Sequence, residues 1–437
     1  MKINSESIKH LIANIQTGKV STPSYVLDES VLIENLEILQ RVERQSGCRI
    51  LLAQKAFSVY QTYPLIEKYI SGVTASGLFE AKLGHEKMNG ENHVFSPVYK
   101  KEEFGEILNI CDHIIFNSFR EWDRHREQAL EAQRVAVRNG KNGPEYGIRL
   151  NPCCSTQEHA IYDPCAYGSR FGVRKEEFRF DKLEGISGIH FHTLCEQNSG
   201  DLKRTIEAVE REFSPVLHQM KWVNLGGGHH ITREDYDIET LIACIRHLQE
   251  TYDVQVYLEP GEAVVLNAGY MVSRVLDIGD NGIKTAILDA SAACHMPDII
   301  EMPYTPKGMA VRDGRIIKNT AVYGISQEGT TDYTISEPGV PVSGIEGMDG
   351  KNSPKQNPEV YRFGGNTCLA GDVFGDYKFE RKLQEGDHIV LFDMALYSMV
   401  KNNTFNGIGL PSILYMDREG NIETIKRFGY EDFESRL

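Results

Sequence analysis

Short apolar runs recur along the first 260 residues, and each run ends in polar residues or glycine before a helix-like segment. The runs are Arg49–Ala53, Val73–Ala75, Val94–Phe95, Ile114–Phe116, Gly147–Leu150, Gly188–Phe191, Trp222–Leu225 and Val254–Leu258. Short apolar runs bounded by turn residues are typical of buried strands. About eight strand-then-helix units over roughly 210 residues have the rhythm of a (β/α)₈ barrel. An open doubly wound sheet is the alternative, although it seldom needs eight strands.

The segments on either side of these runs have other patterns of apolar and polar residues. Residues 20–28 predict a short strand, and leucines on one face predict a helix from about Glu29 to Gln45. Past Glu262, apolar segments between glycine turns predict a β domain: Tyr270–Ile278, Ile283–Leu288, Met309–Ile317, Val360–Phe363, His388–Phe392 and Ser412–Met416. We therefore predict an α/β chain with a barrel over 28–265. The β domain should comprise 1–27 and 266–437, with a loop insertion over 326–358.

Composition and charge narrow the class of protein. A chain of 437 residues with 41% hydrophobic and 25% charged residues is expected to be globular, with two domains. No apolar run is long enough to cross a membrane and no apolar leader opens the chain, so we expect a cytoplasmic protein without a membrane partner. The formal net charge of −15 disfavours nucleic acid and suits a small cationic partner.

The cysteines indicate reduced thiols. There are nine, scattered without paired spacing, which does not suit a disulfide framework. No Cys-x-x-Cys spacing occurs, so the sequence predicts no metal site.

Lys55 follows the apolar run Arg49–Ala53 at the point where a strand would enter a turn. Desolvation there would lower the pKa of the amine and free it for Schiff-base formation. The alternative is a surface lysine whose stem lies along the strand. Catalytic residues of such barrels follow the carboxyl ends of strands, and this placement favours chemistry.

Two further strand ends carry candidate chemistry. Gly226, Gly227 and Gly228 could let backbone amides approach a phosphate, although a glycine run can also be only a tight turn. Glu259 would be a carboxylate at the end of an apolar strand, and such a group needs a cationic partner. A protonated pyridine nitrogen or a nearby lysine or arginine could fill that role.

Other candidates are weaker by themselves. His192 ends the sixth strand and could stack on a planar ring, whereas His190 is expected to be structural. Cys368 and Asp372 share a glycine-rich loop of the β domain. Tyr397 follows a strand and could contact a phosphate, although a core tyrosine is the default expectation.

Together these residues resemble the fold-type III pyridoxal-phosphate decarboxylases, which include ornithine, arginine and diaminopimelate decarboxylases and, more distantly, alanine racemase. Within this family the chain most resembles the branch that acts on carboxynorspermidine and carboxyspermidine. The resemblance covers nearly the whole chain. It rests on Thr22–Tyr25, Ala53–Phe57, Ser169–Gly172, His190–Asn198, Asn224–His229, Glu259–Glu262, His295–Asp298, Cys368–Asp372, Thr404–Gly407, Leu410–Ile413 and Phe428–Phe433.

The resemblance implies a role for each candidate. Lys55 would hold pyridoxal 5'-phosphate as a Schiff base, His192 would stack on its ring and Glu259 would pair with the ring nitrogen. The phosphate would be bound by Tyr397 and by the three glycines, Gly226, Gly227 and Gly228. Cys368 would enter the site from a partner subunit as proton donor, so the homodimer would be the catalytic unit. Asp372 would pair across the dimer with Arg170.

One departure from the family indicates the substrate. Ornithine and diaminopimelate decarboxylases have arginine where this chain has Glu262. A carboxylate would repel phosphate, so Glu262 is expected to face a cationic amine, with Asp289 and Asp298 as further candidates. We therefore expect decarboxylation of carboxynorspermidine or carboxyspermidine to norspermidine or spermidine. The alternatives are a diaminopimelate- or ornithine-type decarboxylase and a non-catalytic pyridoxal-phosphate-binding homologue. The segment between Pro306 and Pro358 also looks longer than in this branch.

Overall fold

The computed structural model describes residues 4–157, 162–317, 319–323 and 359–437, and the predicted insertion at 326–358 lies outside them. The chain divides into two compact units. One unit comprises Glu34–Val264, and the other comprises Met1–Ile33 together with Val265–Leu437. We describe each unit by itself and refer to them as the barrel unit and the sheet unit.

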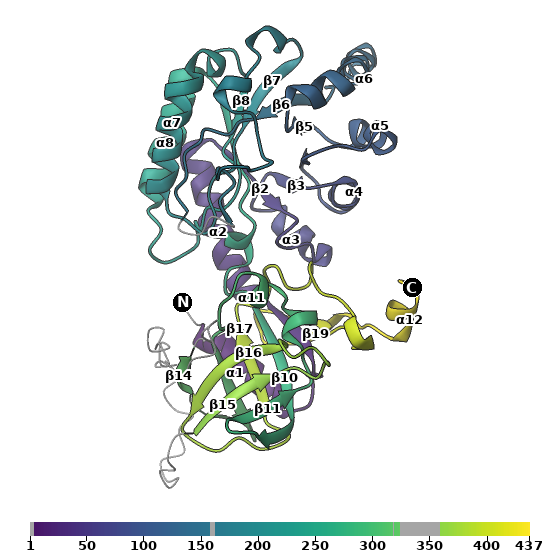
Figure 1. The fold of residues 1–437 in the computed structure, drawn as a ribbon, viewed down its shortest axis with the longest axis vertical. Helices are drawn as coiled ribbons and strands as arrows, with labels where there is room; N and C mark the ends of the chain where they lie inside the picture. The colour runs from purple at the N-terminus through teal and green to yellow at the C-terminus, as the bar shows by residue number, and fades with distance from the viewer. Residues whose placement is uncertain (1–3, 158–161, 318, 324–358) are drawn as a thin grey trace. The chain divides into compact units, whose positions relative to one another are not determined.

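The barrel unit confirms the predicted (β/α)₈ architecture. Its strands close in sequence order, each parallel to its neighbours. Figure 1 labels β2, β3, β5, β6, β7 and β8 in this unit. They are β2 (Arg49–Ala53), β3 (Gly72–Ala75), β4 (Glu91–Phe95), β5 (His113–Phe116), β6 (Glu145–Arg149), β7 (Ile186–His190), β8 (Trp222–Asn224) and β9 (Gln255–Leu258). Because all strands run the same way, their carboxyl ends meet at one mouth of the barrel.

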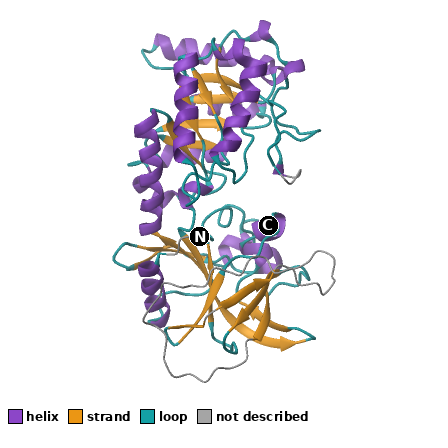
Figure 2. Cartoon of the chain, turned by 90° about the vertical axis from the view of Figure 1, so that its left-hand side faces the viewer, coloured by secondary structure: helices purple, strands orange, loops and turns teal. Residues whose placement is uncertain are grey.

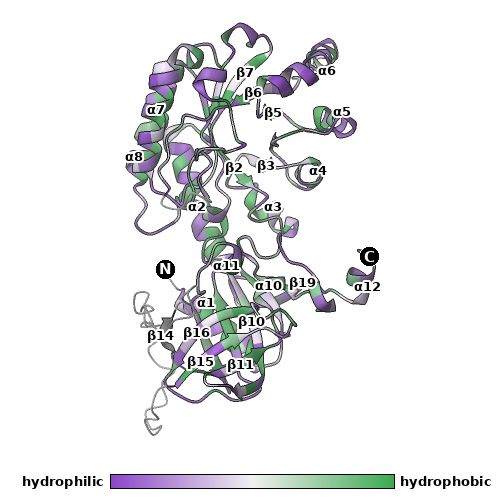
Figure 3. Ribbon diagram, viewed as in Figure 1, coloured by the Kyte–Doolittle hydropathy of each residue, from purple (hydrophilic) through white to green (hydrophobic). Residues whose placement is uncertain are grey.

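Helices surround these strands, as Figure 2 shows. They are α2 (Glu29–Ser46), α3 (Tyr63–Ile66), α4 (Leu78–Lys87), α5 (Lys101–Ile110), α6 (Phe119–Arg138), α7 (Ser199–Leu217), α8 (Ile238–Tyr252) and α9 (Glu262–Val265). Hydrophobic and hydrophilic residues alternate along α7 in Figure 3, as expected of a helix with one buried face. The helix predicted from Glu29 to Gln45 is confirmed as α2.

Trp222 is buried in a core cluster of the barrel unit. Its indole lies against Gly147 of β6 and Gly188 of β7, where an added Cβ would collide with the ring. Its ring is also stacked on His113, with centroids 4.7 Å apart. The two glycines inside strands are therefore explained by the close approach of a large side chain.

The sheet unit contains one sheet of eleven strands, in which β13-β12-β17-β10-β11-β15-β16-β14 are neighbours in that order. Strand β1 pairs with β10 and β18, and β18 pairs with β19. The bounds are β1 (Ser24–Asp28), β10 (Gly269–Asp280), β11 (Lys284–Leu288), β12 (Gly308–Arg312), β13 (Arg315–Ile317), β14 (Asn319–Tyr323), β15 (Glu359–Gly364), β16 (Val373–Phe379), β17 (His388–Phe392), β18 (Ser412–Met416) and β19 (Ile422–Lys426). The short helices are α10 (Ala292–His295), α11 (Asp298–Glu301) and α12 (Tyr430–Glu434).

The first helix was not predicted. Helix α1 (Ser5–Gln16) buries Ile8, Leu11, Ile12 and Ile15 against strands of the sheet unit. Asn4 caps it by accepting hydrogen bonds from the amides of Glu6 and Ser7. The i, i+3, i+4, i+7 spacing of these apolar residues is the signal that would have found it.

One predicted strand is wrong in its extent. Met309–Ile317 was expected as one run, but it forms the antiparallel pair β12 and β13. Asp313 and Gly314, both with positive φ, make the turn between them, which is typical of a hairpin loop. In the described part of the chain, no helix is both long and apolar enough to cross a membrane.

Candidate active site

Three of the predicted residues and the triple-glycine loop each follow the carboxyl end of a barrel strand. Lys55 follows β2, His192 follows β7, the loop Gly226–Gly228 follows β8 and Glu259 follows β9. Since these strands are parallel members of a closed barrel, the residues gather at the same mouth. The other polar strand ends have structural roles: Asn117, for instance, binds the backbone of Arg170 and Gly172 through its side-chain amide.

Glu259 is buried and held by three neutral donors. Its Oε1 accepts hydrogen bonds from Thr74 Oγ1 at 2.9 Å and Asn224 Nδ2 at 2.8 Å. Its Oε2 accepts one from His190 Nε2 at 3.2 Å. Burial alone would raise the pKa of Glu259, but the interactions with His190 and Asn224 outweigh it and lower that pKa to about 2.

Glu259 makes no ion-pair contact with a lysine or arginine among the described residues. Burial lowers the pKa of His190, which favours the neutral ring, and its Nε2 donates to Glu259. Among the described residues, no lysine or arginine forms an ion pair with Glu259, so the alternative of a local salt bridge is wrong for this part of the chain. A carboxylate can accept about four hydrogen bonds, and Glu259 Oε2 therefore has room for one more donor.

His192 presents a neutral ring at the mouth. The amide of Gly227 donates to its Nδ1 at 3.2 Å. Burial, followed by the positive charges of Lys55 and Arg149, lowers its pKa well below the usual range. The proton of the neutral ring therefore lies on Nε2, and the uncharged aromatic face is suited to stacking on another ring.

The triple-glycine loop is shaped by close packing. Gly226 and Gly228 have φ of 70° and 82°, and a Cβ on Gly228 would collide with the carbonyl of Leu194. The amide of Gly226 donates to Asn224 Oδ1 at 2.8 Å, and that of Gly227 donates to His192. Within the described residues, the amide of Gly228 alone among the three donates no hydrogen bond. The loop is thus a tight turn, and its Gly228 amide is available to donate a hydrogen bond to a bound group.

Lys55 lies in a turn with a fixed backbone. The preceding Gln54 is fully buried, and its side chain donates to the carbonyl of Glu80 and accepts from Tyr63. The Lys55 side chain remains open to solvent at the mouth, yet its pKa is lowered, first by desolvation and then by Arg149. The carboxylates of Glu259 and Glu262 oppose this shift. The amine is therefore easier to deprotonate than that of an ordinary surface lysine.

Arg149 is a residue that the sequence analysis missed. It ends β6, is 5% exposed and donates from Nη2 to the carbonyl of His192 at 3.0 Å. Its guanidinium lies over the rings of Phe95 and Phe171, 4.5 Å from each centroid. Burial lowers its pKa to about 10, so it remains charged at neutral pH. A strand-end position was its only sequence signal.

Glu262 forms an ion pair that the sequence did not reveal. Its Oε2 lies 2.7 Å from Nε2 of His230, which is mostly buried. Burial opposes protonation, but the hydrogen bond and charge of Glu262 raise the pKa of His230. A carboxylate oxygen of Glu196 completes a group whose ligand atoms all lie within 4.8 Å of one another. This group of two carboxylates and one histidine lies beside the glycine loop, since His230 follows Gly228 by two residues.

The remaining candidates lie in the sheet unit. Tyr397 is partly buried with φ of 44°, a backbone conformation that a non-glycine residue seldom adopts. Cys368 is exposed, and its amide donates to Asn406 Oδ1 at 2.7 Å. Their predicted contacts with phosphate and with the reacting carbon stay predictions.

Three acidic residues of the sheet unit already have partners. Asp298 pairs with Lys401 at 2.8 Å, and Asp289 accepts from Ser273 Oγ at 2.7 Å. Asp372 is 3% exposed and accepts from the Ser291 and Thr367 hydroxyls. The predicted salt bridge between Asp372 and Arg170 stays a prediction, and the burial of Asp372 within its own unit argues against it. Arg170 itself is exposed and stacks on Phe171.

The barrel residues fit pyridoxal 5'-phosphate. Lys55 offers an amine of lowered pKa, Glu259 offers an ionised oxygen with spare acceptor capacity, and His192 offers a neutral ring. Thr74, Asn224 and His190 were missed as functional residues because each lies within an otherwise apolar strand, where a polar side chain is easily taken as structural. Their shared contact with Glu259 is visible only in three dimensions.

Comparison with known proteins agrees with this geometry. Residues 24–395 match the family model described as pyridoxal-dependent decarboxylase, C-terminal sheet domain. A carboxynorspermidine/carboxyspermidine decarboxylase from Campylobacter jejuni is 40% identical over 96% of this chain and 99% of its own length. A carboxyaminopropylagmatine decarboxylase from Synechocystis is 34% identical over 98% of both chains.

Solved structures agree as well. The crystal structure of carboxynorspermidine decarboxylase complexed with norspermidine from Campylobacter jejuni is 37% identical, covers 96% of this chain and 100% of that one, and has a TM-score of 0.79. A diaminopimelate decarboxylase has a TM-score of 0.74 over 99% of this chain and 96% of its own, but at 16% identity it shows the fold alone.

Proposed function

Because the chain belongs to the family of pyridoxal-dependent decarboxylases, we propose that it removes the α-carboxyl group of carboxynorspermidine or carboxyspermidine and releases norspermidine or spermidine. It would thereby act in polyamine biosynthesis. A cytoplasmic location stays a prediction, with which the nine free cysteines are compatible.

The observation that carries this proposal is the state of Glu259. A buried carboxylate with three neutral donors and no lysine or arginine partner among the described residues is matched to a cation brought by the cofactor. A protonated pyridine nitrogen would supply both a positive charge and an additional donor for Oε2. A ring nitrogen that stays protonated favours decarboxylation, because the ring then accepts the electrons left by the departing CO₂.

The other residues divide the remaining tasks. When bound, pyridoxal phosphate supplies the electron sink for the carbon–carbon bond that breaks. Lys55 would attach the cofactor through its amine, whose pKa is lowered by desolvation and then by the charge of Arg149. His192 would pack its ring on the cofactor ring, and the amide of Gly228 would donate to the phosphate.

The substrate preference follows from the acidic group beside the loop. Glu262 and Glu196 lie close together, and His230 orients Glu262 through the 2.7 Å contact. An ammonium group of a polyamine could form charge-assisted hydrogen bonds with the carboxylate of Glu262. Asp289 and Asp298 are kept as weaker substrate-binding candidates, because each is already bonded within the sheet unit.

The dimeric part of the proposal concerns Cys368. Its exposure is compatible with an approach to the active site of a second copy, where the thiol would protonate the decarboxylated carbon. Tyr397 would contact the phosphate.

A substrate panel tests the function. Purified holoenzyme should release CO₂ from carboxynorspermidine or carboxyspermidine with kcat/KM at least about 100-fold above that for diaminopimelate or ornithine, since several charges must be matched at once. Lys55→Ala should abolish both turnover and the visible absorbance of lysine-bound cofactor. A variant that still turns over would contradict the assignment of Lys55.

A second substrate belongs in the panel because of the Synechocystis relative. Its name contains agmatine, which carries a guanidinium group in place of a terminal ammonium. A site built from Glu196 and Glu262 can pair with either group. If carboxyaminopropylagmatine has the highest kcat/KM, the reaction class stands and the proposed substrate is wrong.

A further inference from the structure

A second cluster of chemically capable side chains lies inside the barrel unit, away from the mouth. Glu91 opens β4, His93 lies two residues later, and His113 opens β5. Residues two apart on a strand share a face, and His93 and His113 are direct partners in the parallel register of β4 and β5. The three side chains therefore gather toward the amino-terminal ends of the strands, opposite to Lys55 and Glu259.

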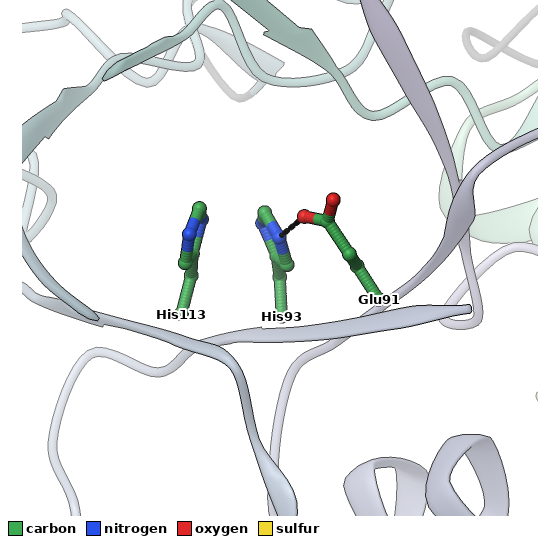
Figure 4. A group of neighbouring side chains, drawn as sticks. All are labelled: Glu91, His93 and His113. Atoms are coloured by element: carbon green, nitrogen blue, oxygen red, sulfur yellow. Dashed lines mark hydrogen bonds and ion pairs between the residues drawn. The ribbon is translucent and has the colours of Figure 1, made fainter. Parts of the chain in front are cut away.

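The geometry of this cluster suits a metal ion. One ligand atom of each residue lies within 4.8 Å of the others. His93 Nε2 is 2.9 Å from Glu91 Oε2, and the two imidazole rings have centroids 4.0 Å apart. Figure 4 shows the three side chains standing side by side and pointing the same way from neighbouring strands.

The two histidines also have unsatisfied nitrogens. His93 is fully buried and His113 is 7% exposed, yet Nδ1 of each ring has no hydrogen-bond partner among the described residues. Buried polar atoms without partners are uncommon in folded proteins, because each loses its hydrogen bonds to water without replacing them. A metal ion bound at Nδ1 of either ring would give that atom the partner that it lacks.

The surroundings hold the cluster in place. His113 is stacked on Trp222, and His93 lies 4.8 Å from the ring of Tyr257. Arg49 forms an ion pair with Oε1 of Glu91, which leaves Oε2 directed at His93. Such neighbours orient the ligands of metal sites and restrict their rotamers.

The cluster can be reached from solvent. Glu91 and His113 line a cavity together with Arg49, Asp112 and Tyr257, and the Glu91 side chain is 20% exposed. An ion could therefore enter from this side, and water could complete its coordination. An accessible entry path is one of the requirements for a metal site.

We propose that Glu91, His93 and His113 bind a divalent transition-metal ion, foremost Zn²⁺, at the amino-terminal end of the barrel. Two imidazoles and one carboxylate with an open position are a ligand set that zinc accepts, and hard ions such as Mg²⁺ would bind there poorly. The ion joins β4 to β5 and stabilises the barrel, and it takes no part in decarboxylation. The cysteine spacing that disfavoured zinc in the sequence has no bearing on a site made of histidines.

A metal titration of the holoenzyme tests this site. After treatment with a chelator, the protein should bind one equivalent of Zn²⁺ or Co²⁺, and Co²⁺ should give ligand-field bands typical of nitrogen and oxygen ligands. Zinc at about 100 times its Kd should raise Tm by about 5–10 °C. Glu91→Gln and His113→Asn should each weaken binding by at least about tenfold, while Tm without metal shows whether each variant folds.

Matched variants locate the ion. His247 forms an exposed pair with Glu210 at 2.7 Å, so His247→Gln should leave binding unchanged. Glu262→Gln removes a carboxylate from the acidic group at the mouth and should also leave binding unchanged. The proposal is overturned if the holoenzyme binds no stoichiometric Zn²⁺ or Co²⁺. It is equally overturned if Glu262→Gln abolishes binding while Glu91→Gln retains it.

Discussion

At the scale of single residues, the active site depends on neutral groups that hold charged ones. Thr74, Asn224 and His190 keep Glu259 ionised without cancelling its charge. His230 differs, because the hydrogen bond and charge of Glu262 raise its pKa and so favour its protonated form. In the proposed function, the two carboxylates of the motif Glu259–Glu262 would serve different partners, a ring nitrogen and an ammonium group.

The role of Glu262 leads to a kinetic prediction. Glu262→Gln should raise KM for the carboxylated triamine by about tenfold or more with a smaller effect on kcat, because a charged contact made in both ground and transition states is lost. Steady-state kinetics and cofactor absorbance measure both quantities. Glu239→Gln, an exposed change on α8, is the control. Loss of cofactor from Glu262→Gln would instead place this residue at the phosphate.

The pairing of His230 leads to a pH prediction. Its pKa is raised above the value of about 6.5 for an unfolded histidine, so folding favours the protonated form. The stabilisation is fully present below about pH 6.5 and is lost as pH rises through the raised pKa. We expect the Tm advantage of the unmodified protein over His230→Gln to be largest near pH 6 and to shrink toward pH 9. An advantage that grows with pH would contradict the ion pair.

At the scale of elements, glycines inside strands decide how the barrel is filled. Gly188 of β7 and Gly147 of β6 make room for the indole of Trp222. That ring in turn supports His113, so the packing of three strands fixes one proposed metal ligand. Glycine inside a strand usually lowers the stability of the strand, but here it is required to leave space for the indole.

Gly188→Ala tests this packing. An added methyl group would collide with Trp222, and forcing extra volume into a packed core costs about 1–3 kcal/mol. Denaturant unfolding should show this loss of stability. Gly200→Ala in α7 is the control, since nothing lies within 4 Å of its Cβ, and it should leave stability unchanged or slightly higher. Equal effects of both changes would mean that Trp222 does not limit the space at Gly188.

At the scale of the whole molecule, the proposed chemistry draws on both units. The barrel unit holds Lys55, His192 and Glu259, whereas the sheet unit carries Cys368 and Tyr397. If Cys368 acts on the active site of a second copy, a single chain cannot form a complete site. Each site then needs Lys55 from one copy and Cys368 from the other.

Subunit mixing tests the shared site. Lys55→Ala and Cys368→Ala proteins should each be nearly inactive alone. When equal amounts are mixed and subunits exchange, half of the dimers contain one copy of each variant, and one of the two sites in such a dimer has both intact residues. The mixture should therefore recover up to about one quarter of the original activity. CO₂ release measures the recovery, and sedimentation confirms exchange. If subunits exchange but activity does not recover, each active site is complete within one chain.

Much of the fold could be predicted from local pattern. All eight barrel runs were found because each short apolar segment, such as Trp222–Leu225, carries its own turn signal. Helix α1 and strands β14, β16 and β19 were missed, and one run split into β12 and β13 at Asp313. The apolar spacing of α1 was overlooked, whereas the missed strands are decided by pairing with distant strands, as β16 pairs with β14 and β15.

The sequence by itself determined which groups follow the strand ends, because chain order in a parallel barrel sends Lys55, His192, the glycine loop and Glu259 to one mouth. Only the tertiary structure decided their partners. Thr74, His190 and Asn224 meet at Glu259 from three strands, Arg149 lies over two aromatic rings, and His230 pairs with Glu262. Such contacts depend on barrel closure and on side-chain packing across strands, which periodicity along one strand cannot encode.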